Sequence, residues 1–262
     1  MATALDHLLT HLADEAATGA LVGPAGTLYL LDGAVAHAEC AGSPDVGTLL
    51  VRAGRLDAAV WRDAHDGGAR SLLEHGHLTR GELEICHLGA LHDAAYLLRS
   101  RPEGPVRFDH GVRHWLGPVR SAPVAALDRE MRRRSRLLRR IWPHDEVDSA
   151  PVRPRRAGER GPAGRGPAGR CAVTPRQLDV LRLADGRRTP ADIATALARP
   201  AYRTLLDVRR LAAAGLVETP HTFPTPLPRR RADAPPPPAP TPTDCPDIAT
   251  LRRIRDALEA LR

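Results

Sequence analysis

Residues 174–217 constrain the fold more than any other segment of this 262-residue chain. They read TPRQLDVLRLADGRRTPADIATALARPAYRTLLDVRRLAAAGLV. Thr174 and Thr189 each precede a proline, which is typical of a helix N-cap followed by the first helical residue. Apolar residues then recur at helical spacing, and Gly215 ends the last run. The pattern predicts a helix-turn-helix whose helices span residues 175–185, 190 to the Arg199-Pro200 break, and 201–214.

The third predicted helix is the one that would enter the major groove of DNA in such a unit. Its exposed face is expected to carry four residues that contact DNA: Tyr202, Arg203, Thr204 and Arg210. Asp207 is expected on the same face, where it would face the phosphates unfavourably. Three further arginines flank that face and are expected to hold phosphates: Arg187, Arg188 and Arg199.

The segments LDVLRLADGRRTPADIATAL and TLLDVRRLAAAGLV resemble winged-helix regulators of the MarR-like type. They are also similar to the small winged-helix chaperones that hold ribosomal precursor peptides. The first resemblance implies a DNA-binding module, and the second implies a module that binds a peptide. No wing is predicted, because Val217 leads directly into proline-rich sequence.

The N-terminal part predicts a mixture of helices and short strands. A helix is expected over residues 4–18, and two strands flank the hairpin signal Asp32-Gly33. The segments 49–61 and 71–84 form a weak repeat, in which a helix closed by glycine is followed by a polar N-cap and a second helix. A longer helix over 82–99 and a final strand in PVRFDH complete the part.

Residues 1–118 resemble the PATAN-type domain, which occurs beside signalling modules in bacteria. The resemblance rests on GTLYLLDGAVAHAEC and LHDAAYLLRSRPEGPVRFDHG, with eight matching positions: Gly26, Leu28, Leu30, Asp32, Gly33, His37, Ala38 and Phe108. It implies an input domain that does not catalyse a reaction.

The charge is distributed unevenly along the chain. Residues 1–128 carry a net −6, residues 129–173 carry +8 and residues 174–217 carry +4. A helix over 127–141 (the segment 119–142) bears an arginine cluster, and residues 143–173 are expected to form a basic Gly/Pro linker. This cluster either contacts DNA phosphates or an acidic partner, is masked by the acidic N-terminal part, or is a solvated helical face. Its members are Arg132, Arg133, Arg134 and Arg136.

The C-terminal sequence predicts a stiff tether with a helix at its end. Residues 220–246 are rich in proline and are expected to be extended. Residues 247–262 have apolar side chains at helical spacing, and we expect this face to dock on a protein partner or on the chain itself. The predicted docking residues are Ile248, Leu251, Ile254, Leu258 and Leu261.

Several classes of function are not expected from this sequence. No catalytic constellation, phosphate-binding loop or cofactor motif is present, and His75, His77, Cys86, His87 and His92 do not form a metal-ligand pattern. Dispersed cysteines, no signal peptide and no membrane-spanning run favour a cytoplasmic protein. All 38 basic residues are arginine, which indicates a GC-rich genome such as that of an actinobacterium.

The sequence therefore predicts an α+β, mostly helical protein: an α/β domain with a β-hairpin, a three-helix winged-helix-like domain, and a proline-rich tail with a terminal helix. The expected function is a transcriptional regulator that binds DNA and no cofactor. The alternative is a non-enzymatic adaptor whose winged-helix module binds a peptide or partner protein.

Overall fold

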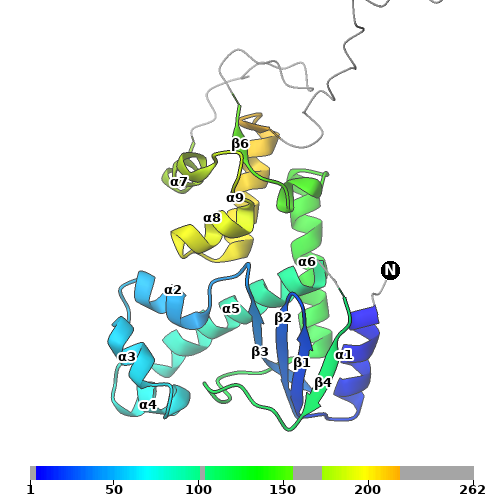
Figure 1. Ribbon diagram of the computed structural model, residues 1–262, viewed down its shortest axis with the longest axis vertical. Helices are drawn as coiled ribbons and strands as arrows, with labels where there is room; N and C mark the ends of the chain where they lie inside the picture. Colours follow the sequence, from blue (N-terminus) through cyan, green and yellow to red (C-terminus); the bar gives the residue numbers. More distant parts are fainter. Residues whose placement is uncertain (1–3, 101–103, 156–172, 219–262) are drawn as a thin grey trace, which may run out of the picture. The chain divides into compact units, whose positions relative to one another are not determined.

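The computed structural model describes residues 4–100, 104–155 and 173–218. Within these ranges the chain has an α+β fold (Figure 1). The helices are α1 (Ala4–Asp14), α2 (Val46–Arg52), α3 (Ala58–Asp63), α4 (Gly68–Glu74), α5 (Arg80–Ser100), α6 (Val124–Ile141), the 3-10 helix η1 (Glu146–Asp148), α7 (Pro175–Leu183), α8 (Pro190–Leu197) and α9 (Ala201–Ala213). The strands are β1 (Gly19–Gly23), β2 (Gly26–Leu31), β3 (Ala34–Cys40), β4 (Arg107–His110), β5 (Ala122–Pro123), β6 (Arg153–Pro154) and β7 (Val217–Glu218).

The main sheet is antiparallel in the order β4-β1-β2-β3-β5. The predicted hairpin is confirmed, because β2 and β3 are joined at Asp32-Gly33 and both turn residues have positive φ, as a tight two-residue turn requires. Leu28 and Leu30 alternate with the half-buried Tyr29, so one face of β2 enters the core. Strand β1 was not expected from the sequence, and it places β4 at the sheet edge.

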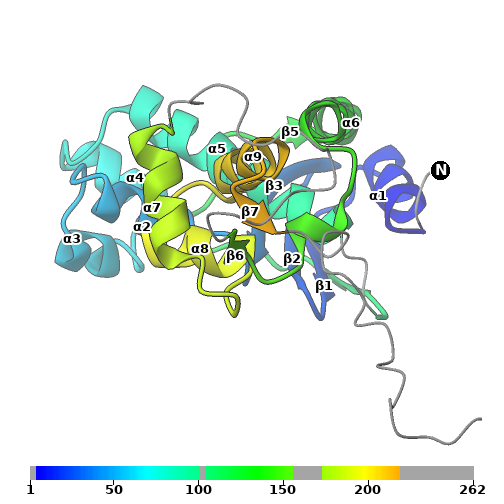
Figure 2. The ribbon, with the colours of Figure 1, turned by 90° about the horizontal axis from the view of Figure 1, so that it is seen from above.

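The predicted helical repeat is also confirmed. Helices α2 and α4 are followed by Gly54 and Gly76, both with positive φ, and then by α3 and α5. Asp57 caps α3 through the backbone N–H of Ala59, and Thr79 shares a capping box with Glu82 at the start of α5. Figures 1 and 2 both place α2–α4 at one end of α5, and in both views the main sheet lies between these helices and α1.

The three helices predicted in residues 174–217 are present as α7, α8 and α9. Thr174 and Thr189 form the predicted N-caps, each in a complete capping box with proline in the first turn. Strand β7 after α9 pairs with β6, which lies in the predicted linker. Val147 and Val152 from that region are fully buried in the core of this unit, so the linker prediction is wrong for residues 143–155.

The N-terminal part and the three-helix unit share one core. Leu9 of α1, Leu30 of β2 and Leu91 of α5 belong to the same buried cluster as Tyr202 and Leu205 of α9. The two further clusters lie among α2–α5 and within the three-helix unit. Residues 4–218 are therefore not two bodies joined only by a tether, and this shared core fixes the surroundings of α9.

Candidate interaction groove

Helix α9, the predicted DNA-reading helix, is largely covered. Arg203 and Arg210 are exposed as expected, but Tyr202 and Thr204 are only 7% and 2% exposed, and Asp207 is buried as well. The prediction that these three lie on an open face is therefore wrong. The reason is tertiary: α9 packs on α5 and α6 as well as on α7 and α8. At the start of α9, where base contacts are usual, Tyr202 and Thr204 are covered and Arg203 is exposed.

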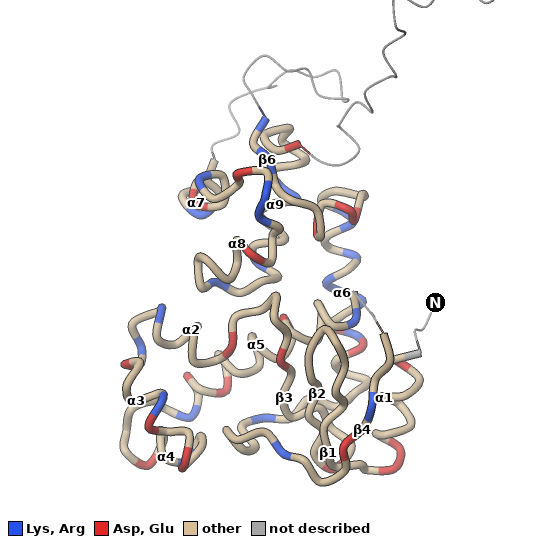
Figure 3. The backbone as a smooth tube through the Cα atoms, viewed as in Figure 1, with Lys and Arg blue, Asp and Glu red and all other residues tan. Residues whose placement is uncertain are grey.

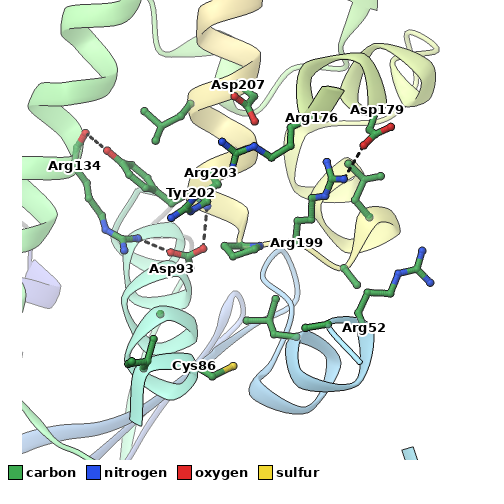
Figure 4. A pocket seen from close by; sticks show the side chains of 18 of the residues that line it. Arg52, Cys86, Asp93, Arg134, Arg176, Asp179, Arg199, Tyr202, Arg203 and Asp207 are labelled. Carbon is green, nitrogen blue, oxygen red and sulfur yellow. Dashed lines mark hydrogen bonds and ion pairs between the residues drawn. The ribbon is translucent and has the colours of Figure 1, made fainter. Parts of the chain in front are cut away.

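A buried polar network joins α9 to the N-terminal part. Asp93 of α5 accepts a hydrogen bond from the backbone N–H of Tyr202 at 3.0 Å, so a carboxylate from α5 caps α9. Its other oxygen pairs with Arg134 Nη1 of α6 at 2.6 Å (Figure 4). The Tyr202 hydroxyl donates to the backbone oxygen of Arg134, whose guanidinium lies over the Tyr202 ring. All three residues are less than 9% exposed, which fixes the start of α9 in place.

Beside this network lies a groove with a cavity volume of about 1160 Å³. We call it the α9 groove; it is lined by residues of α2, α5, α6, α7 and α9 and of the α8–α9 turn. The exposed Arg203 and Arg210 line it, so the accessible side of α9 faces a concave surface. Ile85 of α5, which is 77% exposed, lines the same groove.

Arginine dominates the polar lining of the α9 groove. Seven arginines and three aspartates line it, and four of the arginines are paired with acids. Arg199, a predicted phosphate contact, pairs with Asp179 at 2.7 Å. Among the described residues, Arg52, Arg176 and Arg203 make no ion pair. In Figure 4, Arg176 and Arg203 come from α7 and α9, and Arg52 comes from α2.

The arginine cluster of α6 is mostly neutralised by acids of the same region. Arg132 pairs with Asp128 at 2.8 Å, and Arg133 donates two hydrogen bonds to Glu130. The Arg133 guanidinium lowers the pKa of Glu130 to about 2. Arg134, predicted to contact DNA, is instead buried between Asp93 and Glu130. Figure 3 shows basic positions along α6 and α9 with acidic positions between them.

The remaining predicted contacts lie elsewhere. Arg136 is exposed on α6 and lines a different cavity, together with Asp6 and Arg209. Arg187 and Arg188 are exposed in the α7–α8 turn, outside the α9 groove. The predicted docking residues of 247–262 lie outside the described residues.

Three histidines of the N-terminal part, His37, His87 and His114, form a cluster of adjacent rings. His37 donates from Nε2 to the backbone oxygen of Gly117, and His87 Nε2 lies 3.1 Å from His37 Nδ1. Burial lowers the pKa of His37 to about 3 and that of His87 to about 4. Burial also raises the pKa of the Cys86 thiol to about 11, so it is a poor nucleophile. In the described part of the chain, no group of three or more His, Cys, Asp or Glu residues could hold a metal ion.

Several residues that shape the groove were not predicted as site residues, among them Ile85, Asp93, Arg52 and Arg176. Ile85 lies off the stripe of Leu83, His87 and Leu91, which are buried at a spacing of four residues. Its apolar side chain out of phase with that stripe is the signal that identifies it. Asp93 and Arg52 carry no comparable signal, because charged residues on helices are usually solvated.

Comparison of the chain with protein-family models, with curated proteins and with solved structures finds no match. None of the helices in the described ranges has the length and apolar character needed to cross a membrane.

Proposed function

We propose that this protein is a non-enzymatic adaptor that binds a segment of another polypeptide in the α9 groove. In this proposal residues 1–118 form a PATAN-like interaction domain, and α7–α9 with β6 and β7 form a winged-helix-like module. The observation that carries the proposal is that Tyr202 and Thr204 are buried while the exposed Arg203 between them lines a groove, so the accessible side of the start of α9 is concave. Duplex DNA needs a helix that projects into its major groove, whereas a peptide fits a concave site.

The composition of the groove supports a polypeptide occupant. It combines an exposed aliphatic side chain, Ile85, with arginines that have no acidic partner among the described residues. Concave, partly apolar sites with a few convergent polar groups are typical of ligand and peptide binding.

Selection of a displayed random-peptide library on the full chain tests this proposal. Binding peptides should be recovered, and they should lose affinity for an Ile85→Asp variant. A Val112→Asp variant is the matched control, because Val112 is also exposed, at 44%, and lies outside the groove. Peptides that bind both variants equally, or no selected peptides at all, would refute the proposal.

A second candidate is a DNA-binding regulator held in a masked state. It is favoured by the Asp93 network, which ties the acidic N-terminal part to the basic helix α6 and to the start of α9. If α9 is masked, Asp93→Ala should increase affinity for host genomic fragments, and the gain should disappear with Arg203→Ala. The adaptor predicts no such gain and only weak duplex binding that falls steeply with salt.

A further inference from the structure

The lining of the α9 groove indicates the chemistry of the segment that fills it, and this inference rests on the proposed function. We infer that the occupant is an acidic amphipathic segment of another protein. Its aliphatic side chains contact the apolar floor of the groove, and its carboxylates pair with the arginines at the rim.

The charge of the lining favours an acidic partner. Arg52, Arg176 and Arg203 come from three separate helices, and they line one cavity with no ion pair among the described residues. The aspartates of the lining are already engaged, since Asp93 pairs with Arg134, Asp179 with Arg199 and Asp207 with Arg210. Guanidinium groups bind carboxylates with two parallel hydrogen bonds, so a carboxylate-bearing segment satisfies them.

The apolar part of the lining requires aliphatic side chains as well as charge. Ile85 is 77% exposed, and four leucines that also line the groove are each partly exposed rather than fully covered. They are Leu49, Leu137, Leu197 and Leu206. A simple polyanion cannot cover these groups, whereas a segment with leucine-like side chains on one face removes them from water.

Other occupants fit this lining less well. The chain's own terminal segment, residues 247–262, contains four arginines and three acids and thus has the same sign of charge as the groove. Single-stranded nucleic acid needs exposed aromatic rings on which bases stack. Tyr202 is the aromatic residue that lines the groove, and it is buried under Arg134.

The test measures fluorescence anisotropy of a labelled peptide with the full chain. The probe is a synthetic amphipathic helix of Glu, Ala and Leu, and the matched probe carries Lys at every Glu position. The acidic probe should bind, more weakly as salt is raised, and the basic probe should not. Ile85→Ser should weaken binding about tenfold or more, because it removes the aliphatic side chain that the bound peptide would cover. Arg52→Ala and Arg203→Ala should each weaken it about two- to fivefold.

Matched controls lie outside the groove. Val112→Ser and Arg113→Ala replace exposed residues of the same types and should leave the affinity unchanged. Circular dichroism spectra of all variants should coincide with that of the unchanged chain, because each replaced side chain is exposed.

The possible outcomes separate the inference from the proposed function. If uncharged or basic peptides bind in an Ile85-dependent manner, the proposed function stands and the inference is overturned. Three results would identify another occupant and would also overturn the inference. A dimer that Ile85→Ser dissociates identifies a second copy of the chain, and acidic-probe binding that Leu251→Ser strengthens identifies the chain's own terminal segment. Ile85-dependent binding of a single-stranded oligonucleotide identifies nucleic acid. If no peptide binds and duplex DNA binding depends on Arg187, both proposals fail.

Discussion

The buried carboxylate of Asp93 should contribute more to stability than any surface acid of the chain. It is 4% exposed and lies 2.6 Å from the guanidinium of Arg134, which is itself 8% exposed. Removing one partner of a buried ion pair costs about 3–5 kcal/mol, because the other charge is left uncompensated. Arg134 keeps a hydrogen bond to Glu130 at 2.9 Å, which favours the lower end of that range.

The lost helix cap adds to this cost. Asp93→Ala also removes the acceptor for the Tyr202 N–H, and loss of an N-cap costs about 1 kcal/mol. We therefore expect Asp93→Ala to lower the free energy of unfolding by about 4 kcal/mol. Asp93→Asn keeps an acceptor of the same shape but loses the charge, and it should cost about 2 kcal/mol.

Urea unfolding followed by circular dichroism measures both changes. Glu74→Ala is the matched control, since Glu74 forms a solvent-exposed pair with Arg70 on α4 and its loss should leave the midpoint unchanged. If Asp93→Ala shifts the midpoint no more than Glu74→Ala, the reasoning about the network is refuted. The urea midpoint of Asp93→Ala should also lie below that of Asp93→Asn, and both should lie below that of the unchanged chain.

Three further outcomes are expected. Gly33→Ala should lower the free energy of unfolding by about 1–2 kcal/mol, because Gly33 has φ +75° and a Cβ there would lie 2.6 Å from a backbone oxygen of α1. Equal melting temperatures of the variant and the unchanged chain would contradict this. The free energy of unfolding should fall by about 2–4 kcal/mol between pH 7 and pH 5, because His37 and His87 have pKa values far below 6.5 in the folded protein and take up protons in this range only on unfolding. A urea midpoint that is constant over this range would rule that out. Arg209→Met should lower the free energy of unfolding by about 3 kcal/mol, because it removes the two hydrogen bonds of 2.6–2.7 Å that the Arg209 guanidinium donates to the Asp148 carboxylate. Asp148→Asn in the same background should recover part of the loss.

Local structure in this chain could be predicted from sequence because it depends on neighbouring residues. Thr174 and Thr189 form the predicted caps, and Asp32-Gly33 forms the predicted turn. Each of these features is set by side chains and backbone angles within a few residues, so no knowledge of the tertiary structure is needed.

The surroundings of α9 could not be predicted in the same way. The amphipathic pattern of this helix predicts an open face for Tyr202, yet Tyr202 is covered by residues of α5 and α6, which are remote in sequence. Residues 143–155 lack periodicity and read as a linker, but Val147 and Val152 are buried by contacts with the three-helix unit. Short strands such as β1 are similar, since the sheet that stabilises them is assembled from distant segments.

The cap that Asp93 places on α9 determines whether the three-helix unit can be separated from the rest of the chain. The hydrogen bond that begins α9 depends on a residue 109 positions earlier in the sequence. A fragment of residues 173–218 alone would lack this cap and would expose the part of the shared core that contains Tyr202 and Leu205. We therefore expect that the three-helix unit cannot be transferred to another protein without α5. Residues 4–218 should unfold in one cooperative transition.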